Sequence, residues 1–212
     1  MHKVLCFGDS NTWGTIPSVK GRYNEKERWP RLLASMLSDD FEIIEEGQPS
    51  RTAVHNMPFD GDKTGIRYLK ACLESYSPDL VLIMLGTNDL KKKFNLTVDC
   101  IALGVHEIIE KTLSFKCIDN NNKLHVLLIC PPPIFEVGHY AKIYQGGAAK
   151  SQLLAKSFHH VSKTLDCDFF DAGTVIHSCK KEGIHWQVEQ HSVLAQALSV
   201  IIKKLFMRNK CE

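Results

Sequence analysis

Residues 4–14 read VLCFGDSNTWG, an apolar run that ends abruptly in a glycine, a carboxylate and a hydroxyl. The run predicts a buried strand, and the residues after it predict the start of a helix. Such a turn exposes a side chain above the carboxyl edge of a sheet, where the first N–H groups of the helix can face an anion. Ser10 is therefore placed to act as a nucleophile, although the same serine would also serve as a simple helix N-cap.

Five apolar runs in the chain are continuous rather than alternating, which indicates strands buried on both faces. Apolar residues at helical spacing lie between and after these runs. This alternation predicts the α/β class: a single-domain, three-layer α/β/α sandwich over 1–212 with a flavodoxin-like, five-stranded parallel sheet. The expected strands are 3–8, 41–46, 79–86, 124–130 and 167–171, and the clearest helices are 28–38, 97–114 and 187–206.

The charges of the 212-residue chain are nearly balanced, with 26 basic and 24 acidic side chains and a formal net charge of +2. This balance argues against a strong field for nucleic acid or an anionic membrane, and Lys91-Lys92-Lys93 is expected to be a solvated loop. No apolar stretch approaches the roughly 20 residues that span a bilayer. The first residues also lack the pattern of a secretory signal. We therefore expect a cytoplasmic protein without a nucleic-acid or membrane partner.

The eight cysteines include no CxxC pair, and none has a metal-ligand spacing with the ten histidines. Most are expected to be reduced thiols that pack as small apolar side chains. We expect neither a metal nor an organic cofactor.

A second polar segment, 182–185, reads EGIH and comes just before the last predicted helix. A serine hydroxyl is a weak nucleophile until a base removes its proton, and a histidine oriented by a carboxylate suits that role. Glu182 and His185 are three positions apart in a predicted turn, so their side chains can meet locally. They form a predicted triad with Ser10. His177 and His191 are alternative bases, but neither has an acid at this spacing within a loop.

Acyl transfer also needs hydrogen-bond donors aimed at the developing oxyanion. Asn88 follows the third predicted strand and is the expected side-chain donor, although an Asn-Asp turn closing that strand is the alternative. The N–H of Ser10 is expected to be a second donor, and a third should come from 47–52. Asp9 is expected to be a turn-forming acceptor rather than the catalytic acid.

Together these segments resemble the SGNH, or GDSL-type, serine hydrolase family, whose blocks supply serine, glycine, asparagine and histidine. The chain is most similar to the small arylesterase and acyltransferase branch of that family. The resemblance implies a serine ester hydrolase that cleaves short-chain acyl or aryl esters through an acyl-enzyme on Ser10, and that can transfer the acyl group to alcohols. The matching blocks, in the family's order, are 7–14 (FGDSNTWG), 41–47 (FEIIEEG), 82–89 (LIMLGTND), 169–173 (FFDAG) and 182–185 (EGIH).

The chain departs from this branch at two positions. The family's second block has glycine or alanine where this chain has Ser50, so the implied third oxyanion donor is the backbone N–H of Ser50. A serine there lacks glycine's conformational freedom and narrows the pocket. The family has aspartate where this chain has Glu182, and glutamate reaches roughly 1.5 Å further. The serine therefore predicts reduced activity, whereas the glutamate predicts either a reset turn or a less direct contact with the imidazole.

An apolar acyl or aryl pocket is expected from four side chains near the strand ends: Trp13, Ile134, Phe135 and Trp186. Ordinary core packing is the alternative for each. The expected partner is a small-molecule ester. The resemblance is also compatible with a homo-oligomer whose interfaces involve 47–65 and 131–147.

Other functions fit the same residues. A carbohydrate O-acetylesterase or an acyl thioesterase would use the same triad. A flavodoxin-like phosphate- or nucleotide-binding module would use 10–15 to cradle a phosphate, but it would not require Asn88 or His185. A catalytically degenerate scaffold is the third alternative, and the residues at 50 and 182 are the reason to consider it.

Overall fold

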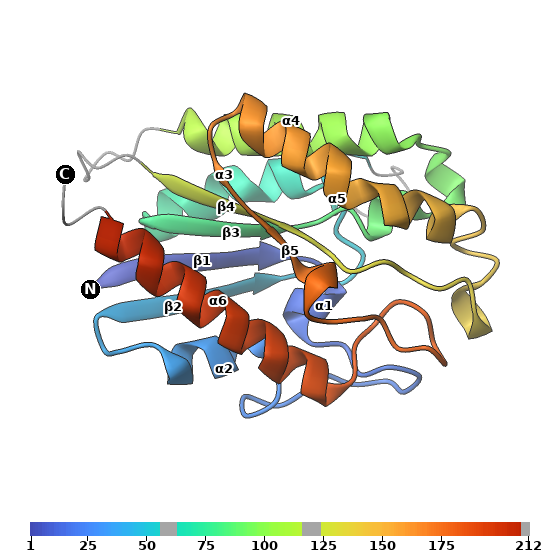
Figure 1. Ribbon diagram of the computed structural model, residues 1–212, viewed down its shortest axis with the longest axis horizontal. Coiled ribbons are helices and arrows are strands. Elements are labelled where there is room, and N and C mark those ends of the chain that lie inside the picture. Colours follow the sequence, from blue (N-terminus) through green and yellow to red (C-terminus); the bar gives the residue numbers. More distant parts are fainter. Residues whose placement is uncertain (56–62, 116–123, 209–212) are drawn as a thin grey trace.

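The computed structural model describes residues 1–55, 63–115 and 124–208 of the chain. Its central feature is a five-stranded parallel sheet in the order β2-β1-β3-β4-β5, with helices on both faces (Figure 1). This is the flavodoxin-like order, so the predicted α/β fold is confirmed. Each expected strand is present, with ends within two residues of those predicted: β1 (His2–Gly8), β2 (Phe41–Gly47), β3 (Leu80–Met84), β4 (His125–Cys130) and β5 (Asp168–Asp171).

The inner strands β1, β3 and β4 are largely continuous apolar runs because both faces of the sheet are covered. The prediction of a strand buried on both faces is wrong for β2 and β5, which lie at the sheet edges, carry charged residues and are mostly half-buried. Along β1, Leu5 and Phe7 belong to the core on one face, whereas Val4 and Cys6 belong to the core on the other. On the first face pack α3 (Gly65–Tyr76), α4 (Val98–Leu113) and α5 (Gly147–Thr164), and on the second α2 (Trp29–Met36) and α6 (Val188–Arg208) (Figure 1).

The structure confirms the three predicted helices. It adds two more, α3 and α5, for which no range was predicted. The predicted segments 28–38, 97–114 and 187–206 contain α2, α4 and most of α6. α3 and α5 are less apolar overall than α4 and α6, because both carry polar residues around a narrow apolar stripe. In α5 this stripe is Leu154, Phe158 and Val161.

Three strand ends meet at one edge of the sheet. Gly8 at the end of β1 pairs with Gly47 of β2 on one side and with Met84 of β3 on the other. A Cβ at Gly47 would lie 2.2 Å from the backbone nitrogen of Trp13, so the first helical turn packs directly on the end of β2. The chain segments that leave these three ends therefore begin side by side.

Several predictions about composition fall on the described residues. No helix within 1–55, 63–115 and 124–208 is long and apolar enough to cross a membrane. The six described cysteines are free thiols, and no group of three or more potential metal-ligating side chains gathers in the described parts of the chain. Of the segment 47–65 that is expected at an oligomer interface, residues 56–62 lie outside the described residues.

Candidate active site

The serine hydroxyl lies at the start of a four-residue helix, α1 (Ser10–Trp13), directly after β1. The residue in the N-cap position is Asp9, whose carboxylate accepts a hydrogen bond from the Asn11 N–H at 2.9 Å. Gly14, at a φ of 93°, ends the helix. Because Asp9 performs the capping, the Ser10 hydroxyl is left for other partners, and the N-cap alternative for Ser10 is wrong.

Ser10 and His185 lie together although 175 positions separate them. The Ser10 Oγ is 3.0 Å from the His185 Nε2, and both residues are buried. Asn11 fixes this approach from the side, because its amide nitrogen donates to the Ile184 carbonyl at 3.3 Å. The turn that carries the hydroxyl is therefore linked directly to the loop that carries the imidazole.

Glu182 binds the opposite nitrogen of the same ring. Its Oε1 forms a short hydrogen bond with the His185 Nδ1, and its Oε2 accepts from the N–H groups of Ile184 and His185 at 2.9 and 2.7 Å. Burial by itself raises the pKa of Glu182, but the contacts with His185 and the two N–H groups together hold that pKa below its ordinary value. The carboxyl group is therefore ionised at neutral pH, and the expected difficulty of the longer side chain does not arise.

A glycine lets the acid and the base share one tight turn. Gly183 has a φ of 99°, and a Cβ there would lie 2.2 Å from the Phe135 carbonyl oxygen. The Phe135 N–H in turn donates to the Gly183 carbonyl at 2.9 Å. This close approach, which a side chain would block, fixes the position of the loop against the segment after β4.

The backbone at position 50 adopts a conformation that favours glycine. Ser50 has a φ of 69°, in the left-handed region where L-residues with a Cβ are disfavoured. The serine thus adopts a glycine-like backbone despite its side chain. Its Oγ accepts a hydrogen bond from the Lys91 ammonium at 3.4 Å.

Asn88 lies in a short 3₁₀ turn, η2 (Asn88–Leu90), beyond β3, and its amide is fixed on both sides. The Nδ2 donates to the Arg51 carbonyl at 3.1 Å and to the Asp9 carboxylate at 3.4 Å, whereas the Oδ1 accepts from the Tyr144 hydroxyl at 3.2 Å. The side chain is aimed at the segments after β1 and β2. It therefore does more than close the turn after its own strand.

Two residues that the sequence analysis left without a role hold the segment after β2 in place. Arg51 donates to the Gly8 carbonyl at 2.9 Å and lies 4.1 Å over the Phe7 ring. Asp89 accepts from the Ala53 N–H at 3.1 and 3.2 Å through its two oxygens. An arginine and an acid next to predicted site residues were the available signals, but their partners lie in distant segments.

Burial also sets the charge of Asp89. Desolvation raises the pKa of this carboxyl to about 7, and the hydrogen bond from Ala53 only partly offsets that rise. The nearby carboxylate of Asp9, whose own pKa burial also raises, acts in the same direction. The oxyanion side of the site thus contains an acid that titrates near neutrality.

The four predicted pocket residues divide into two pairs. Trp186 and Ile134 lie in the two apolar cores, with 0% and 2% of their surface exposed, so the core alternative holds for both. Trp13 and Phe135 are only half-buried and retain accessible surface near the strand ends. Tyr140, which the sequence analysis did not name, packs its ring 5.6 Å from the His185 ring in an edge-on geometry.

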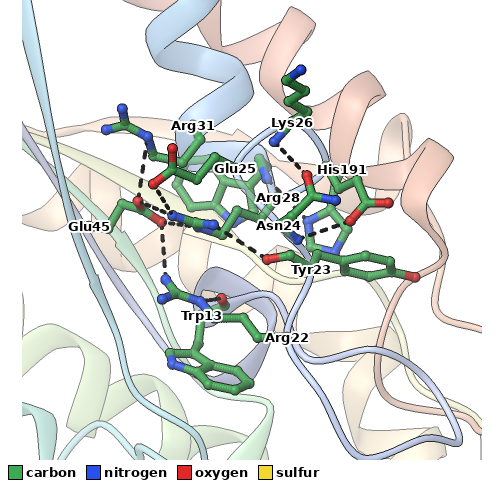
Figure 2. Close-up of polar contacts among 12 residues, drawn as sticks. Trp13, Arg22, Tyr23, Asn24, Glu25, Lys26, Arg28, Arg31, Glu45 and His191 are labelled. Atoms are coloured by element: carbon green, nitrogen blue, oxygen red, sulfur yellow. Dashed lines mark hydrogen bonds and ion pairs between the residues drawn. The ribbon is translucent and has the colours of Figure 1, made fainter.

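The loop after α1 is fixed to β2 through one carboxylate. Glu45 accepts from Arg28 at 2.6 and 2.9 Å and from Arg22 at 3.2 Å, and the Arg31 Nε lies 3.7 Å away (Figure 2). Arg22 also donates to the Trp13 carbonyl at 2.7 Å, and its guanidinium lies 5.1 Å over the Trp13 ring. This network holds Trp13 in place beside the nucleophile turn.

The alternative bases have other surroundings. His191 is buried against the Tyr23 and Trp186 rings, and its Nδ1 accepts from the Trp29 N–H at 3.4 Å. Burial and the nearby His185 lower its pKa to about 3, so it is neutral at physiological pH. His177 is exposed and lies against the Ser178 carbonyl. In the described structure the imidazole within hydrogen-bond distance of Ser10 is that of His185.

These contacts are those that nucleophilic attack by a serine requires. A hydroxyl bonded to an imidazole, whose far nitrogen is held by an ionised carboxylate, can transfer its proton as it attacks a carbonyl carbon. The backbone N–H groups of Ser10 and Ser50 lie at the same strand edge as the Asn88 amide. Neither of these two N–H groups donates to another group in the described parts of the chain.

Comparison with known proteins places the chain among ester hydrolases. The structure is similar to that of an aryl esterase from M. smegmatis, with 36% identity, a TM-score of 0.92 and coverage of 97% of this chain and 100% of that one. It is also similar to a carbohydrate acetylesterase from Sinorhizobium meliloti, with 35% identity, a TM-score of 0.91 and coverage of 97% and 100%.

A curated relative gives a shorter match. An arylesterase of Vibrio mimicus is 36% identical over 89 residues, which are 41% of this chain and 38% of that protein's length. The model of the GDSL-like lipase/acylhydrolase family matches residues 6–190. The chain therefore belongs to the GDSL-like lipase/acylhydrolase family, and the predicted family and enzyme class, a hydrolase of carboxylic esters, are confirmed.

Proposed function

We propose that the protein hydrolyses esters of short-chain acyl groups or of aryl alcohols through an acyl-enzyme on Ser10. Ser10 is the proposed nucleophile, His185 the general base and acid, and Glu182 the residue that orients the imidazole. The proposed oxyanion donors are the N–H groups of Ser10 and Ser50 and the side-chain amide of Asn88.

The proposed reaction has two halves. The Ser10 Oγ bonds to the ester carbonyl carbon while its proton passes to the His185 Nε2, and the carbonyl oxygen becomes an oxyanion. The tetrahedral species then expels the alcohol, which takes the proton from His185. Water repeats the sequence on the acyl-enzyme, so the acid leaves and the Ser10 hydroxyl is restored. An alcohol in place of water would give acyl transfer.

A single observation carries this proposal: the 3.0 Å contact between the Ser10 Oγ and the His185 Nε2, with the Glu182 carboxylate on the opposite ring nitrogen. A buried serine that serves only packing has no need of an imidazole held in this tautomer. The Nδ1 must carry the proton that faces Glu182, which leaves the Nε2 lone pair for the Ser10 hydroxyl.

The substrate class rests on the relatives. Structures described as an aryl esterase and as a carbohydrate acetylesterase are similar to this chain at 36% and 35% identity, which supports a small-molecule ester with a short acyl group. A sugar O-acetyl ester is the second candidate, favoured by the acetylesterase likeness. For an acyl thioester we find no comparable support.

The binding-module alternative has little support at the site. The helix that would hold a phosphate has four residues, and its N-cap position is occupied by the buried carboxylate of Asp9. A negative charge there opposes a bound anion. The degenerate-scaffold alternative loses its motive, because Glu182 reaches His185 and Ser50 adopts the glycine-like backbone.

We extend the proposal to the setting of the protein. Free thiols at the described cysteines support a reducing, cytoplasmic compartment. A family match over 6–190 and one continuous sheet support a single domain across 1–212. The nearly balanced charge supports the absence of a nucleic-acid partner. A homo-oligomer rests on the family resemblance, and sedimentation of the purified protein tests it.

Hydrolysis of p-nitrophenyl acetate and butyrate tests the proposed activity. We expect wild type to turn over both esters, and Ser10→Ala and His185→Ala to lose about 10⁵- to 10⁶-fold in kcat. Ser35→Ala and His177→Ala are matched controls on exposed residues and should behave as wild type. Wild-type rates in the Ser10→Ala and His185→Ala variants would refute the assignment.

A further inference from the structure

A tyrosine hydroxyl lies behind the proposed side-chain oxyanion donor. Tyr144 comes three residues before α5, has 1% of its surface exposed, and donates its hydroxyl to the Asn88 Oδ1 at 3.2 Å. Tyr144 belongs neither to the proposed triad nor to the proposed set of oxyanion donors. Its contact is with the amide oxygen of Asn88 and not with the Nδ2, which is the proposed oxyanion donor.

The orientation of the Asn88 amide decides whether it can donate a hydrogen bond to the oxyanion. Only the Nδ2 carries hydrogens, so a reversed amide would present a lone pair to the oxyanion and repel it. The Nδ2 has two acceptors, the Arg51 carbonyl and the Asp9 carboxylate, whereas the Oδ1 has Tyr144. Reversal would turn the Oδ1 toward those two acceptors and would leave the Tyr144 hydroxyl beside an NH₂ group.

Formation of the oxyanion would change which hydrogen bonds the Asn88 Nδ2 can make. The Nδ2 has two hydrogens and already serves two acceptors, so one of these contacts must be released for the oxyanion. The contact with Asp9 is the longer, 3.4 Å against 3.1 Å, and is the one we expect to yield. After that exchange, Tyr144 and the Arg51 carbonyl remain to hold the amide at its two ends.

The position of Tyr144 is itself well fixed. Its N–H donates to the Tyr140 carbonyl at 2.9 Å, and its carbonyl accepts from the Gly147 N–H at 2.6 Å. The adjacent Ile143 carbonyl accepts from the Lys92 N–H at 2.8 Å, four residues after Asn88. The hydroxyl is therefore anchored to the same segment that carries the amide it contacts.

Burial keeps the hydroxyl a donor. Desolvation and nearby acids such as Asp9 hold the pKa of Tyr144 well above its ordinary value, so it stays protonated at every pH at which the protein would act. The protonated Tyr144 hydroxyl therefore donates its hydrogen bond to the adjacent Asn88 Oδ1.

We infer that Tyr144 is a positioning residue for catalysis, which holds the Asn88 carboxamide with its N–H groups toward the oxyanion. This inference rests on the proposed function, because it assigns a task to one of the proposed donors. It gives a catalytic purpose to a long-range contact on the oxyanion side, made by the segment that precedes α5.

Kinetics of Tyr144→Phe test the inference with the ring retained. We expect kcat on p-nitrophenyl acetate to fall about five- to tenfold, the worth of one hydrogen bond, while KM changes by less than about twofold. In an Asn88→Ala background the same change should cost nothing more, because the donor it orients is absent. Tyr76→Phe is the matched control, since it removes a hydroxyl that donates to Glu46 at 2.8 Å outside the site.

Two kinetic results would overturn the inference: an unchanged kcat in Tyr144→Phe, or an equal loss in the presence and absence of Asn88. A fall in thermal stability with unchanged kcat would likewise assign Tyr144 to packing alone. The Tyr76→Phe variant separates the general cost of losing a tyrosine hydroxyl from the specific effect on kcat.

A measurement without substrate separates this inference from the proposed function. The side-chain NH₂ signals of Asn88 in a ¹⁵N NMR spectrum are identified by their loss in Asn88→Ala. We expect these signals to shift or broaden in Tyr144→Phe and to stay unchanged in Tyr76→Phe. Identical signals in wild type and Tyr144→Phe would refute the positioning role, whereas an absence of ester turnover by wild type would refute the proposed function instead.

Discussion

The two sides of Ser10 are built differently. The base loop, residues 179–186, is held by bonds between near neighbours, among them the carboxylate of Glu182 with its own turn and the Gly183 N–H to the Cys179 carbonyl at 2.6 Å. The oxyanion wall, which we define as 47–53 with Asn88, Asp89 and Tyr144, is held by bonds between distant segments. The contact between the acid and the base is thus made within one turn, and the bonds from Asn11 and Phe135 set where that turn lies. The internal contacts of the wall, by contrast, exist only in the complete fold.

The two regions also treat a buried acid in opposite ways. Burial raises the pKa of both Glu182 and Asp89, but the contacts of Glu182 with His185 and two N–H groups more than compensate. Asp89 has the Ala53 N–H and no comparable imidazole, so its pKa stays at about 7. Hydrogen bonds to the charged form decide which acid is ionised at neutral pH.

The largest effect on activity is expected from a substitution in the base loop. Glu182→Gln replaces the carboxylate that accepts from the His185 Nδ1 with an amide, which no longer stabilises the required tautomer and its protonated form. We expect kcat/KM on p-nitrophenyl acetate to fall by about 10³- to 10⁴-fold with little change in stability. Steady-state kinetics and thermal melting measure the two quantities.

Two further variants sharpen this prediction. Glu182→Asp keeps the charge but shortens the reach by one methylene, so its rate should lie between those of wild type and Glu182→Gln. Glu189→Gln changes an exposed glutamate in the first turn of α6 and should leave the rate unchanged. A Glu182→Gln enzyme as fast as wild type would contradict the role of the acid.

This contrast also explains what the sequence could predict. Glu182 and His185 lie three positions apart, so their contact followed from local geometry alone. The inner strands β1, β3 and β4 were visible because each is largely a continuous apolar run, whereas β2 and β5 show only a short apolar stretch between charged residues. The partners of Asn88 and Asp89 were not visible, because Arg51, Ala53 and Tyr144 reach them only once three strand ends and the segment before α5 come together.

The next largest effect is on the pH dependence of the free energy of unfolding, and it comes from Asp89 in the oxyanion wall. Asp89 binds its proton more tightly when folded, with a pKa of about 7, than when unfolded, so its contribution to stability is fully present below pH 4 and is lost as the pH rises to about 7. We expect this group to lower the free energy of unfolding by about 3 kcal/mol between pH 5 and pH 8. Urea denaturation at a series of pH values measures how the free energy of unfolding changes with pH.

Asp89→Asn isolates the contribution, because the amide oxygen can still accept from the Ala53 N–H without any titration. The variant should lose most of the slope and keep the smaller part that comes from Asp9, whose pKa is also raised. Asp99→Asn, on the exposed surface of α4, should retain the wild-type slope. If wild type and Asp89→Asn show the same pH dependence, Asp89 does not titrate near neutrality.

The smallest effect is expected at Ser50. Its φ of 69° costs a residue with a Cβ about 1 kcal/mol, and glycine avoids that cost but loses more entropy on folding. We therefore expect Ser50→Gly to change the free energy of unfolding by no more than about 1 kcal/mol. Removal of the side chain should raise kcat/KM for p-nitrophenyl butyrate relative to the acetate, because the pocket widens.

Ser18→Gly supplies the matched control, since Ser18 also has a positive φ, 64°, but lies exposed in the loop after α1. The two variants should shift the melting temperature alike, and only Ser50→Gly should change the butyrate-to-acetate ratio. An equal ratio in Ser50→Gly and wild type would show that the serine side chain does not limit the pocket. Two of the four side chains that the sequence predicted for the pocket, Trp186 and Ile134, proved to be core residues.

Covalent labelling tests the central claim most directly. Wild type and His185→Ala are treated with a p-nitrophenyl phosphonate ester for the same time, and the adduct is located by peptide mapping. Attack by the Ser10 oxygen on phosphorus, with loss of p-nitrophenolate, should label the peptide that contains Ser10 in wild type and leave His185→Ala almost unlabelled. A label on another residue, or equal labelling of the two proteins, would contradict the account.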